Sequence, residues 1–257
     1  PTENAELLGT LVEVKKRQAV SGVDINLEQA WKTYGNGNHD TIVAMIDTGI
    51  DYTHEDLKDT LWVNTDEIPG NGIDDDGNGY VDDVYGWNFY NNNNQIFTGE
   101  EDSHGTHGAG TISAGTGNGI GIAGIVPGNR VRVMALKALG GTDGGGSTAA
   151  VIKAIRYAED NGAVICNLSL TSTVDDKALY EAMKNSSMLF VVAAGNGNPK
   201  TGKGVDTDAI PFYPAAYDLD NIISVANLSI DGTLSASSNY GKKTVEVNTP
   251  GQQLELF

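Results

Sequence analysis

Five short segments of the chain are apolar at almost every position, and each has the length of a β-strand. They are Thr41–Asp47, Val131–Lys137, Ala163–Leu168, Met188–Ala194 and Asn221–Ala226. A strand that is apolar on both sides has to be covered on both faces, as the strands of parallel sheets are. The pattern therefore predicts a mostly parallel sheet with helices on both faces.

Helical periodicity appears between these predicted strands. One helix is predicted to begin after Ser147, a favourable N-cap residue, and to end before Gly162. Its buried face would be formed by Ala150, Val151, Ala154, Ile155 and Ala158. A second helix is predicted from about Asp176, an acidic residue suited to a helix N-terminus, to about Lys184. Alternating strands and helices indicate a doubly wound α/β fold.

Two stretches depart from this alternation. Residues 1–17 end in the basic cluster Lys15-Lys16-Arg17 and are predicted to be an N-terminal arm or the remnant of a pro-segment, which leaves one domain over residues 18–257. The stretch Asn64–Asn94 is rich in Asn, Asp and Gly and has little periodicity. A loop of that length in a compact domain is typically either functional or disordered.

Charge and composition narrow the classes of function. The chain carries 34 Asp and Glu residues against 16 Lys and Arg, a net charge of −18. This acidic balance argues against nucleic acid as a partner, because phosphate binding needs clustered cations. Its one cysteine, Cys166, cannot form an internal disulfide, and no apolar run is long enough to span a membrane. We therefore expect neither a nucleic-acid-binding protein nor a membrane-spanning one.

Three polar residues stand at places where a reaction could be carried out. Asp47 ends the first predicted strand in AMIDTGID, and Asn196 follows another strand in VVAAGNGN. The carboxyl ends of parallel strands border the ligand crevice, so both side chains can reach one site. His104 begins HGTHGAG, whose small residues allow a closely packed helix. Taken singly, each has an ordinary alternative: a turn-capping Asp, a structural or metal-binding His, and an Asn-Gly turn.

Taken together and in this order, DTGID, HGTHGAG and AAGN closely resemble the motifs of the subtilisin-like serine proteases. The resemblance covers roughly residues 18–251 and includes ICNLSL and YPAAY. It implies that Asp47 orients the imidazole of His104, that His104 is the general base, and that Asn196 donates to the oxyanion. It also implies a secreted, extracellular serine endopeptidase.

The same resemblance implies where a substrate binds. Three glycines match the strand along which a substrate backbone pairs, and two further residues match the opposite edge. The implied substrate-binding residues are Gly144, Gly145, Gly146, Ser169, Leu170 and Gly195. An extended peptide would bind between the two edges as an added strand.

The chain departs from the family pattern at three points. Gly108 in HGTHGAG stands where a β-branched residue is usual, so looser packing beside His104 is expected. Thr171 and Ser172 replace two glycines, which is expected to change how the substrate main chain is held. The family's nucleophile lies in a Gly-Thr-Ser motif, and that motif occurs nowhere in these residues.

The missing motif leads to an expectation about partners. We expect a second chain that carries Gly-Thr-Ser, separated from this one by a cut near Phe257 that autoprocessing can make. The catalytic domain would then be incomplete at the C-terminus of this chain. The alternatives are a catalytically inactive subtilisin-like pseudoprotease and a calcium-binding scaffold.

Acidic residues in the long loop indicate a metal site. Asp74–Asp83 places oxygen ligands in the order of an EF-hand loop, although Tyr85 stands where the final Glu is expected. A solvated Asp/Asn turn is the alternative. The predicted calcium (Ca²⁺) ligands are Asp74, Asp76, Asn78, the Tyr80 carbonyl, and Asp82 or Asp83. By family resemblance, Asp56 and Gln18 are candidate ligands of a further calcium ion.

Overall fold

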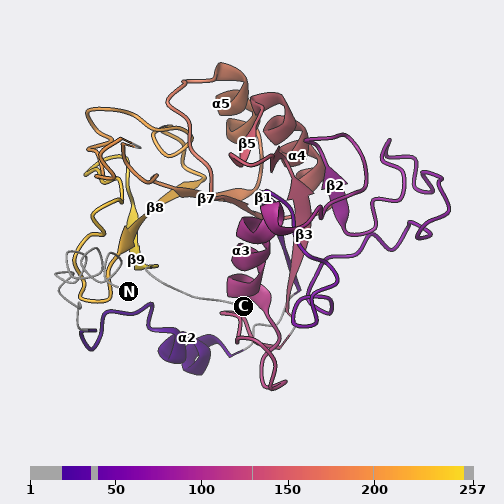
Figure 1. The fold of residues 1–257 in the computed structure, drawn as a ribbon, viewed down its shortest axis with the longest axis horizontal. Coiled ribbons are helices and arrows are strands. Elements are labelled where there is room, and N and C mark those ends of the chain that lie inside the picture. Colours follow the sequence, from indigo (N-terminus) through magenta and orange to yellow (C-terminus); the bar gives the residue numbers. More distant parts are fainter. Residues whose placement is uncertain (1–18, 36–39, 129, 199, 252–257) are drawn as a thin grey trace, which may run out of the picture.

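A parallel sheet of seven strands forms the centre of the molecule, in the order β2-β3-β1-β6-β7-β8-β9 (Figure 1). The computed structural model describes residues 19–35, 40–128, 130–198 and 200–251. The predicted arm over residues 1–17 and the predicted ligand Gln18 lie outside them. Every pairing between neighbouring strands of this sheet is parallel, which confirms the predicted fold class.

All five predicted strands are present, two of them with the predicted bounds. The strands of the sheet are β1 (Thr41–Asp47), β2 (Gly86–Asn88), β3 (Val131–Lys137), β6 (Ile165–Leu168), β7 (Leu189–Ala193), β8 (Ile222–Leu228) and β9 (Val247–Pro250). A small antiparallel pair is formed by β4 (Leu139–Gly140) and β5 (Gly145–Gly146). The short strands β2 and β9 at the two edges were not predicted.

Helices cover the sheet from both sides, as the apolar strands require. They are α2 (Leu27–Tyr34), α3 (Ser103–Ser113), α4 (Thr148–Asp160) and α5 (Lys177–Lys184), with a 3₁₀ turn η1 (Glu100–Asp102) before α3. Helices α4 and α5 lie on one side of the sheet and α3 on the other (Figure 1). The predicted cap of α4 is confirmed, because Ser147 Oγ accepts a hydrogen bond of 3.1 Å from the Ala150 N–H.

Alternate residues of β1 enter two separate apolar cores. Ala44 and Ile46 are fully buried among residues of α4 and α5, whereas Val43 and Met45 are buried among residues of α3 and β3. The two cores explain why β1 is apolar at nearly every position, and they place its last residue, Asp47, at the edge of the sheet between both layers.

The second half of the sheet is covered less evenly. On the α4 and α5 side, Cys166, Phe190 and Val192 are at most 1 % exposed. On the side of α3, the neighbouring residues Val191 and Ile223 are only half-buried. One face of β6, β7 and β8 is therefore only partly covered in the described residues.

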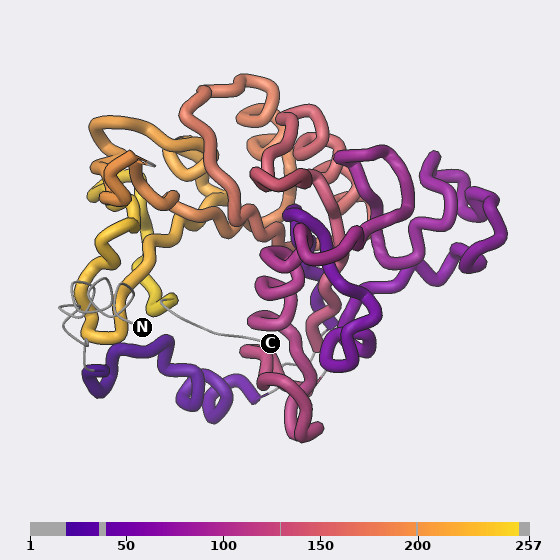
Figure 2. Tube along the Cα trace, in the orientation of Figure 1, coloured from indigo at the N-terminus to yellow at the C-terminus, as the bar shows by residue number. Residues whose placement is uncertain are grey.

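The long loop of residues 64–94 projects from one side of the molecule (Figure 2), and β2 is the one regular element within it. Its backbone is held by carboxylates instead: Asp74 accepts hydrogen bonds from the N–H groups of Gly77, Asn78 and Gly79. At the base of the loop, Tyr80 packs edge-to-face on Tyr157 of α4, with ring centres 5.1 Å apart. The loop is thus attached to the helix layer by an aromatic contact.

Candidate active site

Asp47 and His104 meet at the carboxyl edge of β1. The Asp47 carboxylate is 2 % exposed, and its Oδ1 lies 2.7 Å from Nδ1 of His104 in the first turn of α3. The same oxygen accepts the N–H of Thr48 at 2.7 Å. A buried acceptor at Nδ1 fixes the neutral ring with its proton on Nδ1, so Nε2 is left free to act as a base.

The surroundings of His104 alter its basicity in two ways. The hydrogen bond that His104 donates to Asp47 raises the pKa of His104 above its ordinary value, while partial burial acts in the opposite direction and is the weaker effect. The side chain remains 61 % exposed, so a substrate can reach it. The pair has the arrangement of a general base and the group that orients it.

Asn196 follows β7 at the same edge of the sheet and is exposed. The turn before it is held by Asn239, which is fully buried. Asn239 Nδ2 donates to the Ala194 carbonyl at 2.9 Å, and the Asn239 N–H donates to the Gly195 carbonyl at 2.8 Å. Gly195 has φ of 104°, and an added Cβ would lie 2.6 Å from Asn239 Nδ2, so only glycine fits this turn.

Sequence reasoning did not find Asn239 as a residue of this site. It lies 45 positions from Ala194 along the chain, and the Ser-Asn-Tyr-Gly segment around it carries no signal by itself. The contact that makes it important forms only in the folded sheet.

A groove of about 780 Å³ begins at His104 and runs along the edges of two segments. Five of the six predicted substrate-binding residues line it: Gly144, Gly145, Gly146, Ser169 and Leu170. The sixth, Gly195, does not line it. At Gly146 an added Cβ would lie 2.4 Å from the Ala138 carbonyl oxygen, so the backbone of β5 is pressed closely against its neighbour. The groove has the form needed for an extended chain to lie between two backbone edges.

A second hollow of about 580 Å³ also reaches His104. Asp47, His104, Gly108 and Ser169 border it, together with His54 and His107. His104 therefore borders two hollows, one lined by the glycine-rich segment and one lined by Asp47 and residues of α3.

Met45 occupies the space that Gly108 leaves free. An added Cβ at Gly108 would lie 2.9 Å from Cε of Met45, which is 1 % exposed. The looser packing expected beside His104 is therefore not present, because a long side chain from β1 fills the position. Neither residue alone reveals this exchange in the sequence.

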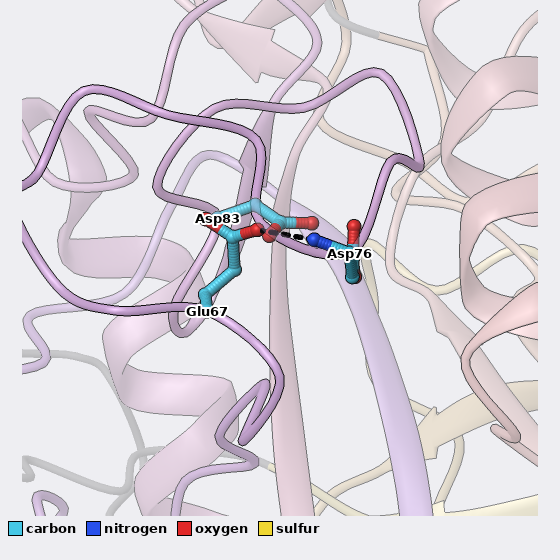
Figure 3. A group of neighbouring side chains, drawn as sticks. All are labelled: Glu67, Asp76 and Asp83. Carbon is cyan, nitrogen blue, oxygen red and sulfur yellow. Dashed lines mark hydrogen bonds between the residues drawn. The ribbon is translucent and has the colours of Figure 1, made fainter.

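Three carboxylates of the long loop lie close together, as Figure 3 shows for Glu67, Asp76 and Asp83. Oxygen atoms of Glu67, Asp76 and Asp83 lie within 4.8 Å of one another. Glu67 is 5 % exposed and Asp83 is fully buried. Among the described residues, no Lys or Arg forms an ion pair with any of them. Asp76, the third member, is exposed. Carboxylates this close together repel unless a cation is present, and oxygen ligands of this kind suit calcium.

Neutral and polar partners hold the three carboxylates in place. Asn64 Nδ2 donates to Asp76 at 3.0 Å and to Asp83 at 2.9 Å. Burial raises the pKa of Asp76, but hydrogen bonds from Asn64 and Asn78 outweigh it and lower this pKa overall. The Tyr157 hydroxyl donates to Asp83 at 2.5 Å, and burial raises the pKa of Tyr157. These hydrogen bonds fix the positions of the Asp76 and Asp83 carboxylates.

The structure distributes the predicted calcium ligands over different places. Asp76 and Asp83 belong to the cluster, together with Glu67, which lies outside the Asp-rich run and was not predicted. Asn78 Nδ2 donates to both Asp76 and Asp83. Asp82 accepts the N–H groups of Asn71 and Gly72 instead, Asp74 holds the loop backbone, and the ring of Tyr80 lies in the aromatic contact with Tyr157.

Asp56, the other candidate ligand, is 3 % exposed and faces the loop of residues 115–122. Its Oδ1 accepts Asn118 Nδ2 at 2.7 Å, and its Oδ2 accepts the Ile122 N–H at 3.1 Å. Both oxygens therefore have protein donors in this structure.

Comparison with known proteins agrees with this arrangement. Residues 38–256 match the model of the subtilase family. The chain is 35 % identical over 215 residues to the major intracellular serine protease of Bacillus subtilis, which covers 82 % of this chain and 58 % of that protein. It is 34 % identical over 230 residues to subtilisin-like protease 1 of Plasmodium falciparum, covering 83 % of this chain and 33 % of that protein.

A solved structure gives the same result for the fold. A protease from Pseudoalteromonas arctica superimposes with a TM-score of 0.64 at 26 % identity, over 88 % of this chain and 67 % of that one. The chain thus spans only about a third to somewhat over half of the curated relatives named above. With the family model matched over most of the sequence, the chain belongs to the subtilase family of serine proteases.

Proposed function

We propose that this chain provides the Asp and the His of an Asp-His-Ser serine endopeptidase that cleaves extended peptide segments. The observation that carries the proposal is the Asp47–His104 hydrogen bond of 2.7 Å at the mouth of a groove. A base oriented by a buried carboxylate is the part of the triad that takes and returns protons.

The proposed residues have distinct tasks in the reaction. His104 Nε2 accepts the proton of a serine hydroxyl while the serine oxygen attacks the carbonyl carbon of the peptide. Asn196 donates a hydrogen bond to the oxygen that becomes negative. His104 then gives the proton to the leaving amine as the C–N bond breaks, and water releases the acyl group by the same route.

The serine itself is proposed to come from a segment outside these 257 residues, carried by a companion polypeptide. No Gly-Thr-Ser occurs in the sequence. The half-buried face of β6, β7 and β8 supports the proposal, because Val191 and Ile223 lack the full cover that their neighbours on the other side have. Apolar surface of this kind favours a covering segment by about 25 cal/mol per Å².

Calcium is proposed as a stabilising ion in the long loop, held by Glu67, Asp76 and Asp83. The support is that no Lys or Arg of the described residues forms an ion pair with these carboxylates. A bound ion would supply the missing positive charge and stabilise the loop; no step of the proposed reaction passes through it.

An extracellular location is part of the same proposal. A loop that needs calcium finds it at the higher concentrations outside cells. The relative from Bacillus subtilis is described as intracellular, so cell fractionation followed by mass spectrometry is the direct test. No helix in the described residues is long and apolar enough to cross a membrane.

Labelling with a fluorophosphonate probe tests the catalytic proposal. The natural protein is purified, labelled and separated under denaturing conditions, with His104→Ala as the matched control. We expect label on a companion polypeptide, none on the polypeptide that carries Asp47 and His104, and none on either in the control. Label on this chain would contradict the two-chain proposal. If the natural protein unfolds cooperatively on heating, and is therefore folded, but takes up no label on any polypeptide, the inactive pseudoprotease would be favoured.

A further inference from the structure

A buried ion pair lies behind Asp47 and His104, and the reaction proposed above does not use it. Lys137, the last residue of β3, is 2 % exposed, and Asp102, just before α3, is fully buried. Lys137 Nζ donates both to Asp102 Oδ1 and to the carbonyl oxygen of Thr48. Burying two charges costs free energy that their attraction only partly returns, so such a pair is weak evidence for stability.

Asp102 forms this ion pair at the expense of its own helix. It occupies the N-cap position of α3, where an Asp side chain usually accepts an N–H from the first turn. Here it makes no such hydrogen bond. Its Oδ2 instead accepts the N–H and the hydroxyl of Thr98, at 2.6 and 2.9 Å. A local preference overridden directly beside a reactive residue is typical of functional sites.

The two charged residues are attached to opposite halves of the catalytic pair. Lys137 is the register partner of Asp47 in the sheet and bonds to the carbonyl of the next residue, Thr48. Asp102 lies two residues before His104 in the same turn. A closed path of contacts therefore runs from Asp47 through Lys137 and Asp102 to His104.

The turn after Asp47 and the start of α3 pack closely against each other. An added Cβ at Gly49 would lie 3.0 Å from the Asp102 carboxyl carbon, and one at Gly105 would lie 3.2 Å from Cβ of Asp47. The Gly105 N–H also donates to the Thr48 hydroxyl at 3.1 Å. The start of α3 and the turn after Asp47 thus touch directly, with the ion pair as their charged connection.

We propose that Lys137 and Asp102 are positioning residues, which hold the first turn of α3 so that His104 stays at the Asp47 carboxylate. The inference rests on the proposed function for its catalytic consequence. Neither residue touches the substrate groove. Without the pair, α3 can shift relative to β1, the Asp47–His104 hydrogen bond lengthens, and the imidazole loses both its orientation and its raised basicity.

The test replaces both charges at once in the complete natural protein. The double variant Lys137→Met with Asp102→Asn leaves no charge buried alone, and the amide oxygen can still accept from Thr98. We expect a melting temperature close to the wild type, a kcat lower by about 10- to 100-fold, and little change in KM. Lys153→Met, at an exposed lysine of α4, is the control for loss of one positive charge.

A second measurement distinguishes this inference from the proposed function. Titration of the His104 ring by NMR should show a lower midpoint in the double variant than in the wild type, whether or not the protein has activity. Absence of fluorophosphonate labelling in the wild type would end the proposed function alone. A double variant with wild-type kcat and wild-type His104 titration would overturn the positioning role.

A milder variant covers the case in which the double variant does not fold. Thr98 is exposed, and Thr98→Val removes one of the donors to Asp102 without burying a charge. The His104 midpoint and kcat should then change in the same direction by a smaller factor. If both values equal those of the wild type, the positioning role is wrong.

Discussion

At the scale of single residues, the site depends on what surrounds one imidazole. Asp47 raises the pKa of His104, and only the neutral ring can accept the serine proton. Activity should therefore fall on the acid side around a midpoint above about 6.5, the ordinary value for histidine. The pKa of His104 is higher in the folded than in the unfolded state. The pair therefore stabilises the fold fully below the unfolded-state pKa of about 6.5, and this stabilisation is lost as the pH rises through the folded-state pKa.

Asp47→Asn tests this electrostatic coupling. The variant should lower the His104 pKa and reduce kcat by about 10⁴-fold, the size of the effect in another Asp-His-Ser enzyme. The pH dependence of kcat/KM and urea denaturation between about pH 5 and 9 give the two readouts. An acid limb that stays at the wild-type pH would show that Asp47 does not set the basicity of His104.

Gly108 and Met45 provide a second residue-scale prediction. Gly108→Val places a side chain against Met45 Cε, and overpacking of this kind costs about 1–3 kcal/mol. Combining it with Met45→Val should restore most of the loss, because the shorter side chain vacates the space. Chemical denaturation of both variants measures the coupling. Equal stability of the single and double variants would contradict it.

The sequence predicts residues whose role is signalled locally, and misses those whose role arises from distant contacts. Asp47 and His104 stand in distinctive motifs at the ends of a strand and at the start of a helix. Asn239, Met45 and Glu67 have no such motif. Each acts through a partner far along the chain or outside its own run of residues, so only the folded structure brings it to the site.

At the scale of elements, the helices differ in whether their N-cap side chain accepts a backbone N–H, and the sequence predicts this only in part. Helix α5 begins at Asp176, whose carboxylate accepts the N–H groups of Ala178 and Leu179. Helix α4 has the matching bond at Ser147, as predicted. Helix α3 has an Asp at the same position and no cap bond. Residue type alone predicts a cap at each of these three helices; the buried lysine to which Asp102 is paired instead lies on a strand 35 positions later.

The edge strands and the organisation of the long loop could not be predicted from the hydrophobic pattern of the sequence. β2 is three residues long and β9 is polar and partly exposed, so neither has the apolar run that revealed the central strands. The loop of residues 64–94 is organised by carboxylates that accept backbone N–H groups, a pattern without a period.

Calcium removal provides the prediction for this loop. Chelation should lower the melting temperature, since an ion at 100 times its Kd stabilises a fold by about 2.7 kcal/mol. Glu67→Gln should reduce the response to added calcium, while the neighbouring exposed Asp66→Asn should not. Melting that is independent of both EDTA and Glu67→Gln would remove the calcium assignment.

At the scale of the whole molecule, the excess of negative charge extends into the groove beside His104. Glu100, Glu101, Asp143 and Asp176 line it, and none of the described residues that line it is Lys or Arg. A field of one sign in a groove concentrates ligands of the opposite sign, and salt screens it.

Cationic peptides should accordingly be cleaved more efficiently than neutral peptides of the same size, and the difference should shrink as salt is added. Paired substrates with Lys or norleucine near the scissile bond, assayed at about 20 mM and 500 mM salt, measure the effect. Glu100→Gln with Glu101→Gln should reduce it. A preference for lysine that is the same at both salt concentrations would have another origin.

The uneven cover of the sheet has a consequence for the single thiol. Cys166 lies on β6 with no exposed surface, and burial raises its pKa. A thiol reagent can react only in molecules whose central strands have separated from the helices above them. The rate of modification under native conditions therefore reports how often the middle of the sheet opens. Since Ile165 and Asn167, the neighbours of Cys166, belong to the partly covered face, a segment that covers this face should slow the reaction without touching the sulfur.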